Sequence, residues 1–177
     1  MNDATTSSPA ALPQQFRMKR SELERFLAQP RVAALSWITA GGEVASTPIW
    51  FTYRDGIFLL HTSHPLPKTR AILKNDHVGL VIQDERPPYR YVSVRGRARL
   101  RQGPEEAWRL YEEQARAYYG PLTGRAYLRY GQRFRRTSQT EDVIIEVTPT
   151  KIVAMSYSDA LNPATLLALR AFRMVKL

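Results

Sequence analysis

The sequence predicts a mainly β fold, a six-stranded antiparallel β-barrel with short peripheral helices. Three segments rich in β-branched and aromatic residues follow one another and are separated by two tight-turn signals, Gly41-Gly42 and Asp55-Gly56. This is the pattern of antiparallel hairpins. Within 91–100, apolar residues alternate with polar ones at the two-residue period of a strand buried on one face. Closing such strands into a barrel leaves few exposed edges, which favours that architecture.

The remaining elements are predicted in order along the chain. The first helix is expected to begin at a capping box formed by Ser21 and Glu24 and to end before Pro30. The expected strands are 32–39, 44–54, 57–62, 78–83, 91–100 and 143–155, the last being either a pair or one bent strand interrupted at Pro149. Further helices are expected over 66–75, from Gly103-Pro104 onward, over 124–136 and over 166–172.

A length of 177 residues suits one domain with a sizeable core. The small and polar residues at the start predict a flexible tail over 1–18, followed by a barrel domain with a C-terminal helix over 19–177. No run approaches the roughly 20 apolar residues of a membrane span, and the N-terminus has no apolar signal core. The lack of cysteine excludes disulfides, thiolate nucleophiles and cysteine metal sites. We therefore expect a soluble, cytoplasmic protein without membrane contact.

The formal net charge of +10 favours an anionic partner, which could be a phosphorylated cofactor, a polyacidic ligand, nucleic acid or a membrane surface. A genome of high GC content, which enriches arginine in proteins, accounts for the same composition without any function. Four arginines would share one face of the strand 91–100 and its flank, namely Arg95, Arg97, Arg99 and Arg101. They form either a groove for an anionic tail or nucleic acid, or a solvated face. In the second case the expected partners are Glu105, Glu106, Glu112 and Glu113.

A phosphate site is indicated where the strand 57–62 ends and the next helix begins. Thr62 and Ser63 supply hydroxyls there, and Lys68 and Thr69 lie in the first turn of the helix, where free backbone N–H groups favour anions. The alternative is a capped helix with a solvated lysine. Earlier in the chain, Pro48 withdraws a ladder donor from its strand and so predicts an edge or a bulge. Backbone groups exposed at that point are open to a flat heterocycle.

The order of several motifs is more specific than any one of them. A hairpin is followed by a strand reading STPIWF (46–51), a strand ending in HTS (61–63), the segment PKTRAILKND (67–76) and a strand reading VGLVI (78–82). This order resembles the pyridoxamine 5'-phosphate oxidase-like family of FMN-binding split barrels. The segment RPPYRYVSVRGRA (86–98) is similar to the deazaflavin (F420)-dependent branch of that family. The resemblance implies a split β-barrel that works as a homodimer, with its cofactor site at the interface.

The resemblance also implies which residues hold the cofactor. Thr62 and Lys68 match phosphate-binding positions, and Arg90 and Tyr91 match positions that approach the cofactor from the partner subunit. The strand lining the ring system corresponds to Ser46, Thr47, Pro48, Ile49 and Trp50. His61, Ser63 and Thr69 complete the predicted cofactor site, because they lie in the same motifs.

Two departures argue against vitamin B6 oxidation. Pro67-Lys68 offers one cation where the family has an Arg-Lys pair, and the final segment 171–177 lacks the family's arginine-rich signature. The resemblance instead implies an oxidoreductase that transfers a hydride to a small organic substrate, with coenzyme F420 as the first choice of cofactor and FMN as the second. The cofactor carries the hydride, so no catalytic residue is assigned. The alternatives are a non-enzymatic binder of heme or another tetrapyrrole and, less favoured, a nucleic-acid-binding module.

Two other residue groups have competing interpretations. His61 and His64 have a spacing that metals use, but no carboxylate lies near them in the sequence, so no metal site is assigned. Trp108, Tyr111 and Tyr118 recur at helical spacing, which predicts a core stripe rather than a platform for stacking ligands.

Overall fold

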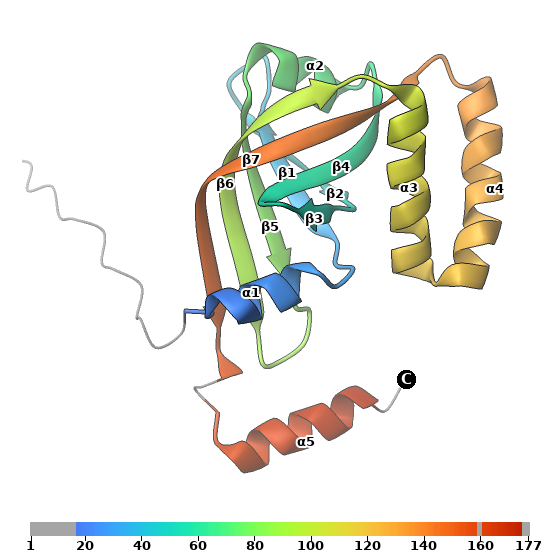
Figure 1. Cartoon of the computed structure of the whole chain (residues 1–177). Coiled ribbons are helices and arrows are strands. Elements are labelled where there is room, and N and C mark those ends of the chain that lie inside the picture. Colours follow the sequence, from blue (N-terminus) through green and yellow to red (C-terminus); the bar gives the residue numbers. More distant parts are fainter. Residues whose placement is uncertain (1–16, 159–160, 175–177) are drawn as a thin grey trace, which may run out of the picture.

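The computed structural model describes residues 17–158 and 161–174 (Figure 1). Most of the tail predicted over 1–18 lies outside the described residues, whereas Arg17 and Met18 run beside the end of the last strand. The strands are β1 (Ala33–Ile38), β2 (Val44–Ile49), β3 (Thr52–Arg54), β4 (Ile57–His64), β5 (His77–Gln83), β6 (Arg90–Arg101) and β7 (Glu141–Ser156). The helices are α1 (Arg20–Leu27), α2 (Pro67–Lys74), α3 (Pro104–Tyr119), α4 (Pro121–Thr137) and α5 (Pro163–Met174).

All seven strands form one antiparallel sheet in the order β2-β1-β5-β6-β7-β4-β3. The mainly β prediction is confirmed. There are seven strands rather than six because the segment predicted as one strand over 44–54 divides in two. Its first part pairs with β1 and its last part pairs with β4.

This division explains the barrel shape. β2 and β3 are the two edges of the sheet, yet only Trp50 and Phe51 separate them in the sequence. A sheet whose opposite edges are joined by two residues must curl until those edges approach each other (Figure 1). The edge position predicted for Pro48 is also confirmed, since β2 pairs with β1 alone.

The longest pairing joins β6 to β7 and contains one irregularity. The register shifts between Arg95 and Gly96, opposite Pro149, so the segment predicted to be interrupted there is one bent strand. Gly96 is required by the close approach of the two strands, because a Cβ atom there would lie 2.8 Å from the carbonyl oxygen of Thr148. The predicted alternation along β6 is confirmed, with buried positions at Val92, Val94, Gly96 and Ala98.

The main core lies inside the curled sheet and is closed by α1 and α2. It is formed by inward-facing side chains of several strands, among them Leu35, Phe58, Leu60, Leu80, Ile82 and Val94. Phe26 and Leu27 of α1 and Ile72 of α2 pack onto this core. The capping-box prediction for α1 is wrong: the helix begins two residues earlier than a Ser21 cap implies, Lys19 occupies the N-cap without a side-chain hydrogen bond, and Glu24 pairs with Arg20.

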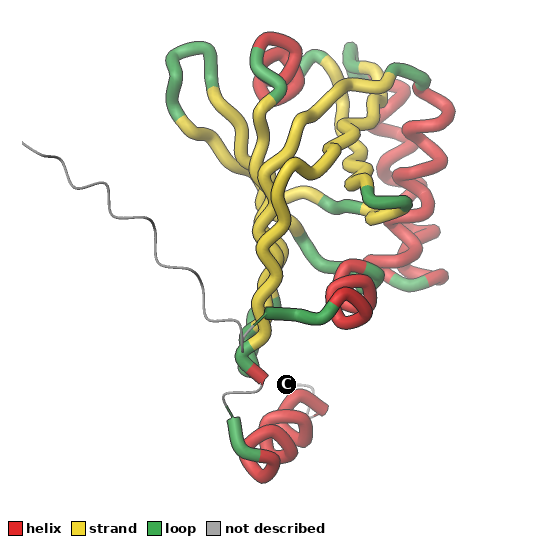
Figure 2. The backbone as a smooth tube through the Cα atoms, turned by 60° about the vertical axis from the view of Figure 1, so that its left-hand side comes forward, coloured by secondary structure: helices red, strands yellow, loops and turns green. Residues whose placement is uncertain are grey.

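The helices α3 and α4 form an antiparallel hairpin beside β4 and β7, away from α1 and α2 (Figures 1 and 2). The hairpin turns at Gly120, whose φ of 79° favours glycine. The two helices touch closely at Gly124, where a Cβ atom would lie 2.8 Å from the carbonyl oxygen of Ala115. No helix within the described residues is long and apolar enough to cross a bilayer. Aromatic residues of the hairpin reach Trp50, in the link between β2 and β3.

Candidate functional site

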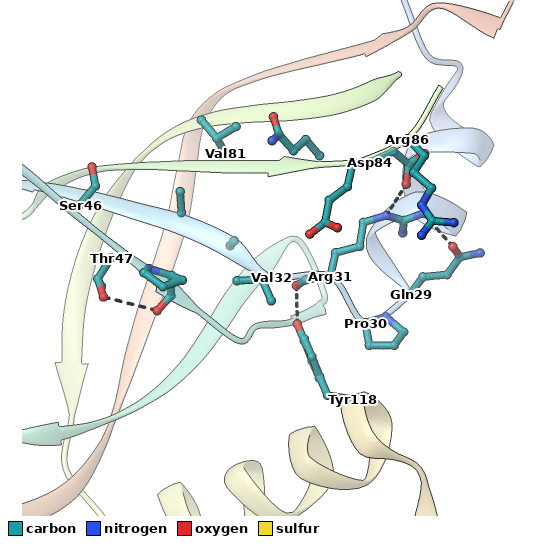
Figure 3. Close-up of a pocket in the computed structure, with 15 residues that line it drawn as sticks. Gln29, Pro30, Arg31, Val32, Ser46, Thr47, Val81, Asp84, Arg86 and Tyr118 are labelled. Atoms are coloured by element: carbon teal, nitrogen blue, oxygen red, sulfur yellow. Dashed lines mark hydrogen bonds and ion pairs between the residues drawn. The ribbon is translucent and has the colours of Figure 1, made fainter. Parts of the chain in front are cut away.

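A groove of about 1170 Å³ lies over β1, β2 and β5. Three residues of the predicted cofactor site line it, namely Ser46, Thr47 and Pro48. Ala34 and Val81 add an apolar floor. Figure 3 shows Ser46 and Thr47 at one end of the groove and a group of charged side chains at the other.

That charged end is built around Asp84, which follows β5. Its carboxylate accepts hydrogen bonds from Arg31 Nε at 3.0 Å and from Arg90 Nε at 2.7 Å. Partial burial opposes ionisation of this carboxyl group, but the two arginines outweigh that effect and keep the pKa of Asp84 below its usual range. Both guanidinium groups also lie over the ring of Phe26. Arg90, expected to reach the cofactor from a partner subunit, is therefore held by Asp84 of its own chain.

The charged end is tied to the helical hairpin through Tyr118. Its hydroxyl donates a hydrogen bond to the carbonyl oxygen of Arg31 at 2.5 Å (Figure 3) and accepts one from the backbone N–H of Phe51 at 3.2 Å. Burial raises the pKa of Tyr118, so the phenol remains a donor at neutral pH. Sequence reasoning assigned Tyr118 to the core, whereas it lines the groove and fixes the link between the two sheet edges.

The residues of the predicted phosphate site gather at the start of α2, but they differ in availability. The Thr69 hydroxyl is used within the chain, since it accepts from the Leu66 N–H, donates to the Leu66 carbonyl and bonds to His64 Nδ1. Thr62 is buried. Lys68 is half-buried, and this burial lowers the pKa of its ammonium group. The charge of Lys68 is therefore partly desolvated, and a bound phosphate would compensate it.

The start of α2 also lies near the ring-lining strand. A cavity of about 390 Å³ separates α2 from the β1–β2 hairpin, and Ala45 and Pro67 both line it. These residues directly precede Ser46 and Lys68. The predicted ring strand and the predicted phosphate residue therefore lie on neighbouring parts of the surface.

The other predicted cofactor residues are dispersed. Ile49 is part of the core, and Tyr91 has its pKa raised by burial and by a hydrogen bond with Tyr157. Trp50 points toward the helical hairpin, where its ring stacks on Tyr118 at 4.9 Å between centroids.

His61 and Trp50 line a second cavity of about 350 Å³ between β4, the β2–β3 link and the hairpin. Its walls are Val32, Pro48, Ile49, Trp50, His61, Tyr111, Gln114 and Tyr127. Trp108 belongs to the core, as predicted, whereas Tyr111 lines this cavity. Periodicity along a helix does not separate the two roles, because a cavity wall and a core face share the same spacing.

The two histidines considered as metal ligands have separate partners. His61 Nε2 lies 3.1 Å from Asp142 Oδ1, and His64 Nδ1 lies 3.0 Å from the Thr69 hydroxyl. Sequence reasoning missed Asp142 because it lies far along the chain, and strand pairing brings it to His61. Across the described ranges 17–158 and 161–174, no group of three metal-ligating side chains was found.

The arginine row of β6 is largely paired with acids. Arg97 contacts Asp76 at 2.6 Å, and both Arg99 and Arg101 pair with the buried Glu146. Of the four expected partners, Glu106 pairs with Arg101. The other three pair elsewhere: Glu105 with Arg135, Glu112 with Arg116 and Glu113 with Arg54. These contacts favour the interpretation of the row as a solvated, ion-paired face.

Comparisons with known proteins agree with this architecture. A conserved hypothetical protein from Mycobacterium tuberculosis matches with a TM-score of 0.71 and 20% identity over 86% of this chain and 94% of its own. A structure described as an F420 reductase matches with a TM-score of 0.57 and 23% identity, over 80% of this chain and 98% of its own. The heme storage protein HutZ from Vibrio cholerae matches with a TM-score of 0.56 and 12% identity, over 77% of this chain and 94% of its own. At these identities the likeness shows a shared fold.

The sequence comparisons identify a family but no individual curated relative. No curated protein matches the chain. Residues 20–156, however, match the profile of the family described as pyridoxamine 5'-phosphate oxidase. Because that match covers well over half of the chain and the fold agrees with it, the chain belongs to the pyridoxamine 5'-phosphate oxidase-like split-barrel family.

Proposed function

We propose that this protein is an oxidoreductase that binds coenzyme F420 or FMN in the groove over β2. The observation that carries the proposal is the groove itself. It exceeds the roughly 300–1,000 Å³ of typical small-molecule pockets, and an edge strand forms one of its sides. Backbone N–H and C=O groups on the outer side of an edge strand are open to a ligand, and a flavin-type ring has both acceptors and a donor along its pyrimidine edge.

The charge distribution supports the same class of ligand. Lys68 would hold the phosphate near the start of α2. Arg31 and Arg86, which line the charged end of the groove beside Asp84 and Glu85, would face the acidic tail of a deazaflavin. Coenzyme F420 is therefore the first choice and FMN the second. When bound, the coenzyme supplies two electrons as a hydride. The protein's own residues bind and orient it, with Ser46, Thr47 and Pro48 beside the ring.

A homodimer is part of this proposal. The outer face of the sheet carries a cross-strand row of small or apolar residues, namely Pro48, Ala34, Val81, Ser93 and Val153. Val81 is 41% exposed. Because the groove opens on this face, a second copy packed against it would cover the coenzyme and exclude water from it.

Heme is the alternative ligand, since the similar HutZ is described as a heme storage protein. Heme iron needs an axial ligand such as His, Cys, Met or Tyr. Among the described residues lining the groove, Tyr118 alone is of these types, and its hydroxyl is hydrogen-bonded to the backbone. Nucleic acid is less favoured still, because the arginine row is largely ion-paired. These contacts favour the flavin-type coenzyme.

The experiment is a titration of the purified protein with F420, FMN and hemin, followed by each ligand's absorbance. We expect saturable binding of F420, weaker binding of FMN and no stoichiometric binding of hemin. A second measurement then follows oxidation of the reduced coenzyme in the presence of small organic acceptors. Stoichiometric binding of hemin without affinity for either coenzyme would replace the proposed function by its alternative.

A further inference from the structure

The cavity between β4 and the helical hairpin has aromatic walls. Trp50 lies 5.5 Å from Tyr127 and 6.1 Å from Tyr111 between ring centroids, and the ring of His61 lies 4.5 Å from Tyr111. We call this cavity the aromatic chamber. Burial, together with a hydrogen bond to Tyr127, raises the pKa of Tyr111, so the Tyr111 ring stays uncharged. Such walls favour a flat, apolar ring system.

The chamber also holds a buried polar atom without a partner. Gln114 is 1% exposed and lines the chamber. Its amide nitrogen donates toward the Leu59 carbonyl at 3.2 Å and the Thr52 hydroxyl at 3.5 Å. Its Oε1 atom has no hydrogen-bond partner among the described residues. A buried acceptor left unsatisfied costs about 1–3 kcal/mol, so this atom is suited to a donor group of a ligand.

The His61 wall of the chamber is held in place by polar contacts. Asp142 accepts from His61 through Oδ1, and its Oδ2 lies 2.9 Å from Arg135 Nε. Arg135 also lies over the ring of Trp108 and pairs with Glu105. The imidazole ring of His61 is thereby fixed against Tyr111. The chamber is consequently a prearranged site, in which little side-chain entropy remains to be lost on binding.

We propose that the aromatic chamber binds a planar compound of about two fused rings that carries an O–H or N–H donor. The rings lie among Trp50, Tyr111 and Tyr127, and the donor bonds to Gln114 Oε1. A volume of about 350 Å³ is at the small end of ligand pockets, which sets this size.

The position of the chamber makes this compound the substrate. Val32 and Pro48 line both the chamber and the groove over β2, so a ligand in the chamber adjoins a ring bound along that strand. This assignment as substrate rests on the proposed function, whereas binding to the chamber does not.

The test uses 2-naphthol as the probe and 2-methoxynaphthalene as its matched partner without a donor. Each is titrated calorimetrically into the protein with no coenzyme added. We expect 2-naphthol to bind roughly tenfold more tightly, as one hydrogen bond to a buried acceptor implies. In Gln114→Met the preference should fall to about one. Equal affinities of the two compounds for the wild-type protein would overturn the proposal, and this result needs no variant to fold.

A pair of tyrosine variants tests the location. Tyr127→Leu should weaken binding of both compounds, whereas Tyr130→Leu should not, because Tyr130 lies on the same helix, is 70% exposed and does not line the chamber. Competitive displacement of 2-naphthol by F420 or FMN would show that the chamber belongs to the coenzyme and would overturn the proposal. Binding of 2-naphthol by a protein that binds neither coenzyme would support the chamber and contradict the proposed function alone.

Discussion

His61 and Asp142 are diagonal neighbours on the paired strands β4 and β7, and a 3.1 Å contact joins His61 Nε2 to Asp142 Oδ1. The register places His61 opposite Ile144 and Asp142 opposite Ser63, a separation that long side chains bridge. The contact is shielded, since both side chains are largely buried. The same carboxylate faces Arg135 of α4, so this pair joins the sheet to the helical hairpin.

Replacing this carboxylate should therefore destabilise the fold. We expect Asp142→Asn to lower the free energy of unfolding by about 1–3 kcal/mol, because the partly buried Arg135 loses one of its two charged partners. Urea denaturation followed by circular dichroism measures the change. The matched control is Glu113→Gln, whose exposed pair with Arg54 should contribute about 0–1 kcal/mol. An equal effect of both substitutions would show that the Asp142 contacts contribute no more than a surface pair.

Asp84 predicts a dependence of stability on pH. Its pKa is lower in the folded protein than the roughly 3.9 of an unperturbed aspartate, so the folded state binds fewer protons at this site. The stabilisation is therefore complete above that pH and is lost as the pH falls below it. Asp84→Asn should reduce the urea midpoint clearly at pH 7 and much less at pH 3. A difference between variant and wild type that stays constant with pH would contradict the assignment.

Lys68 predicts a selective loss of coenzyme affinity. Lys68→Ala should weaken coenzyme binding by roughly 1.5–3 kcal/mol, the range for hydrogen bonds to charged groups, and should leave the melting temperature nearly unchanged. Titration calorimetry with F420 and FMN measures the affinity. Lys19→Ala removes an exposed lysine that is far from Lys68 in the sequence, and it serves as the control. An unchanged affinity in the Lys68 variant would remove this residue from the phosphate site.

The outer row of the sheet predicts the assembly state. The wild-type protein should be a dimer at micromolar concentration, and Val81→Arg should shift it to a monomer, because a charge would be buried in the interface without a partner. Light scattering after size-exclusion chromatography distinguishes the two states. A wild-type monomer would refute the shared interface, and with it the idea that a second copy covers the groove.

The sequence alone predicted those features whose physical cause is local. The alternation along β6 and the edge position of Pro48 follow from side-chain pattern and from the missing N–H of proline. The site depends on contacts between distant segments, and these were missed: Asp84 binds Arg31 across 53 positions, and Asp142 meets His61 across 81. Gln114 gave no signal, because an unsatisfied amide oxygen is a property of the packed structure.

The central claim is that the coenzyme ring lies in the groove over β2, and blocking that groove tests it most directly. Ser46 and Val44 lie on the same face of the same strand, but only Ser46 is among the residues lining the groove. We would titrate the wild type, Ser46→Trp and Val44→Trp with F420 and FMN. The account predicts that Ser46→Trp abolishes measurable binding while Val44→Trp binds as the wild type does. Unchanged affinity in Ser46→Trp, in a variant that melts normally, would contradict it.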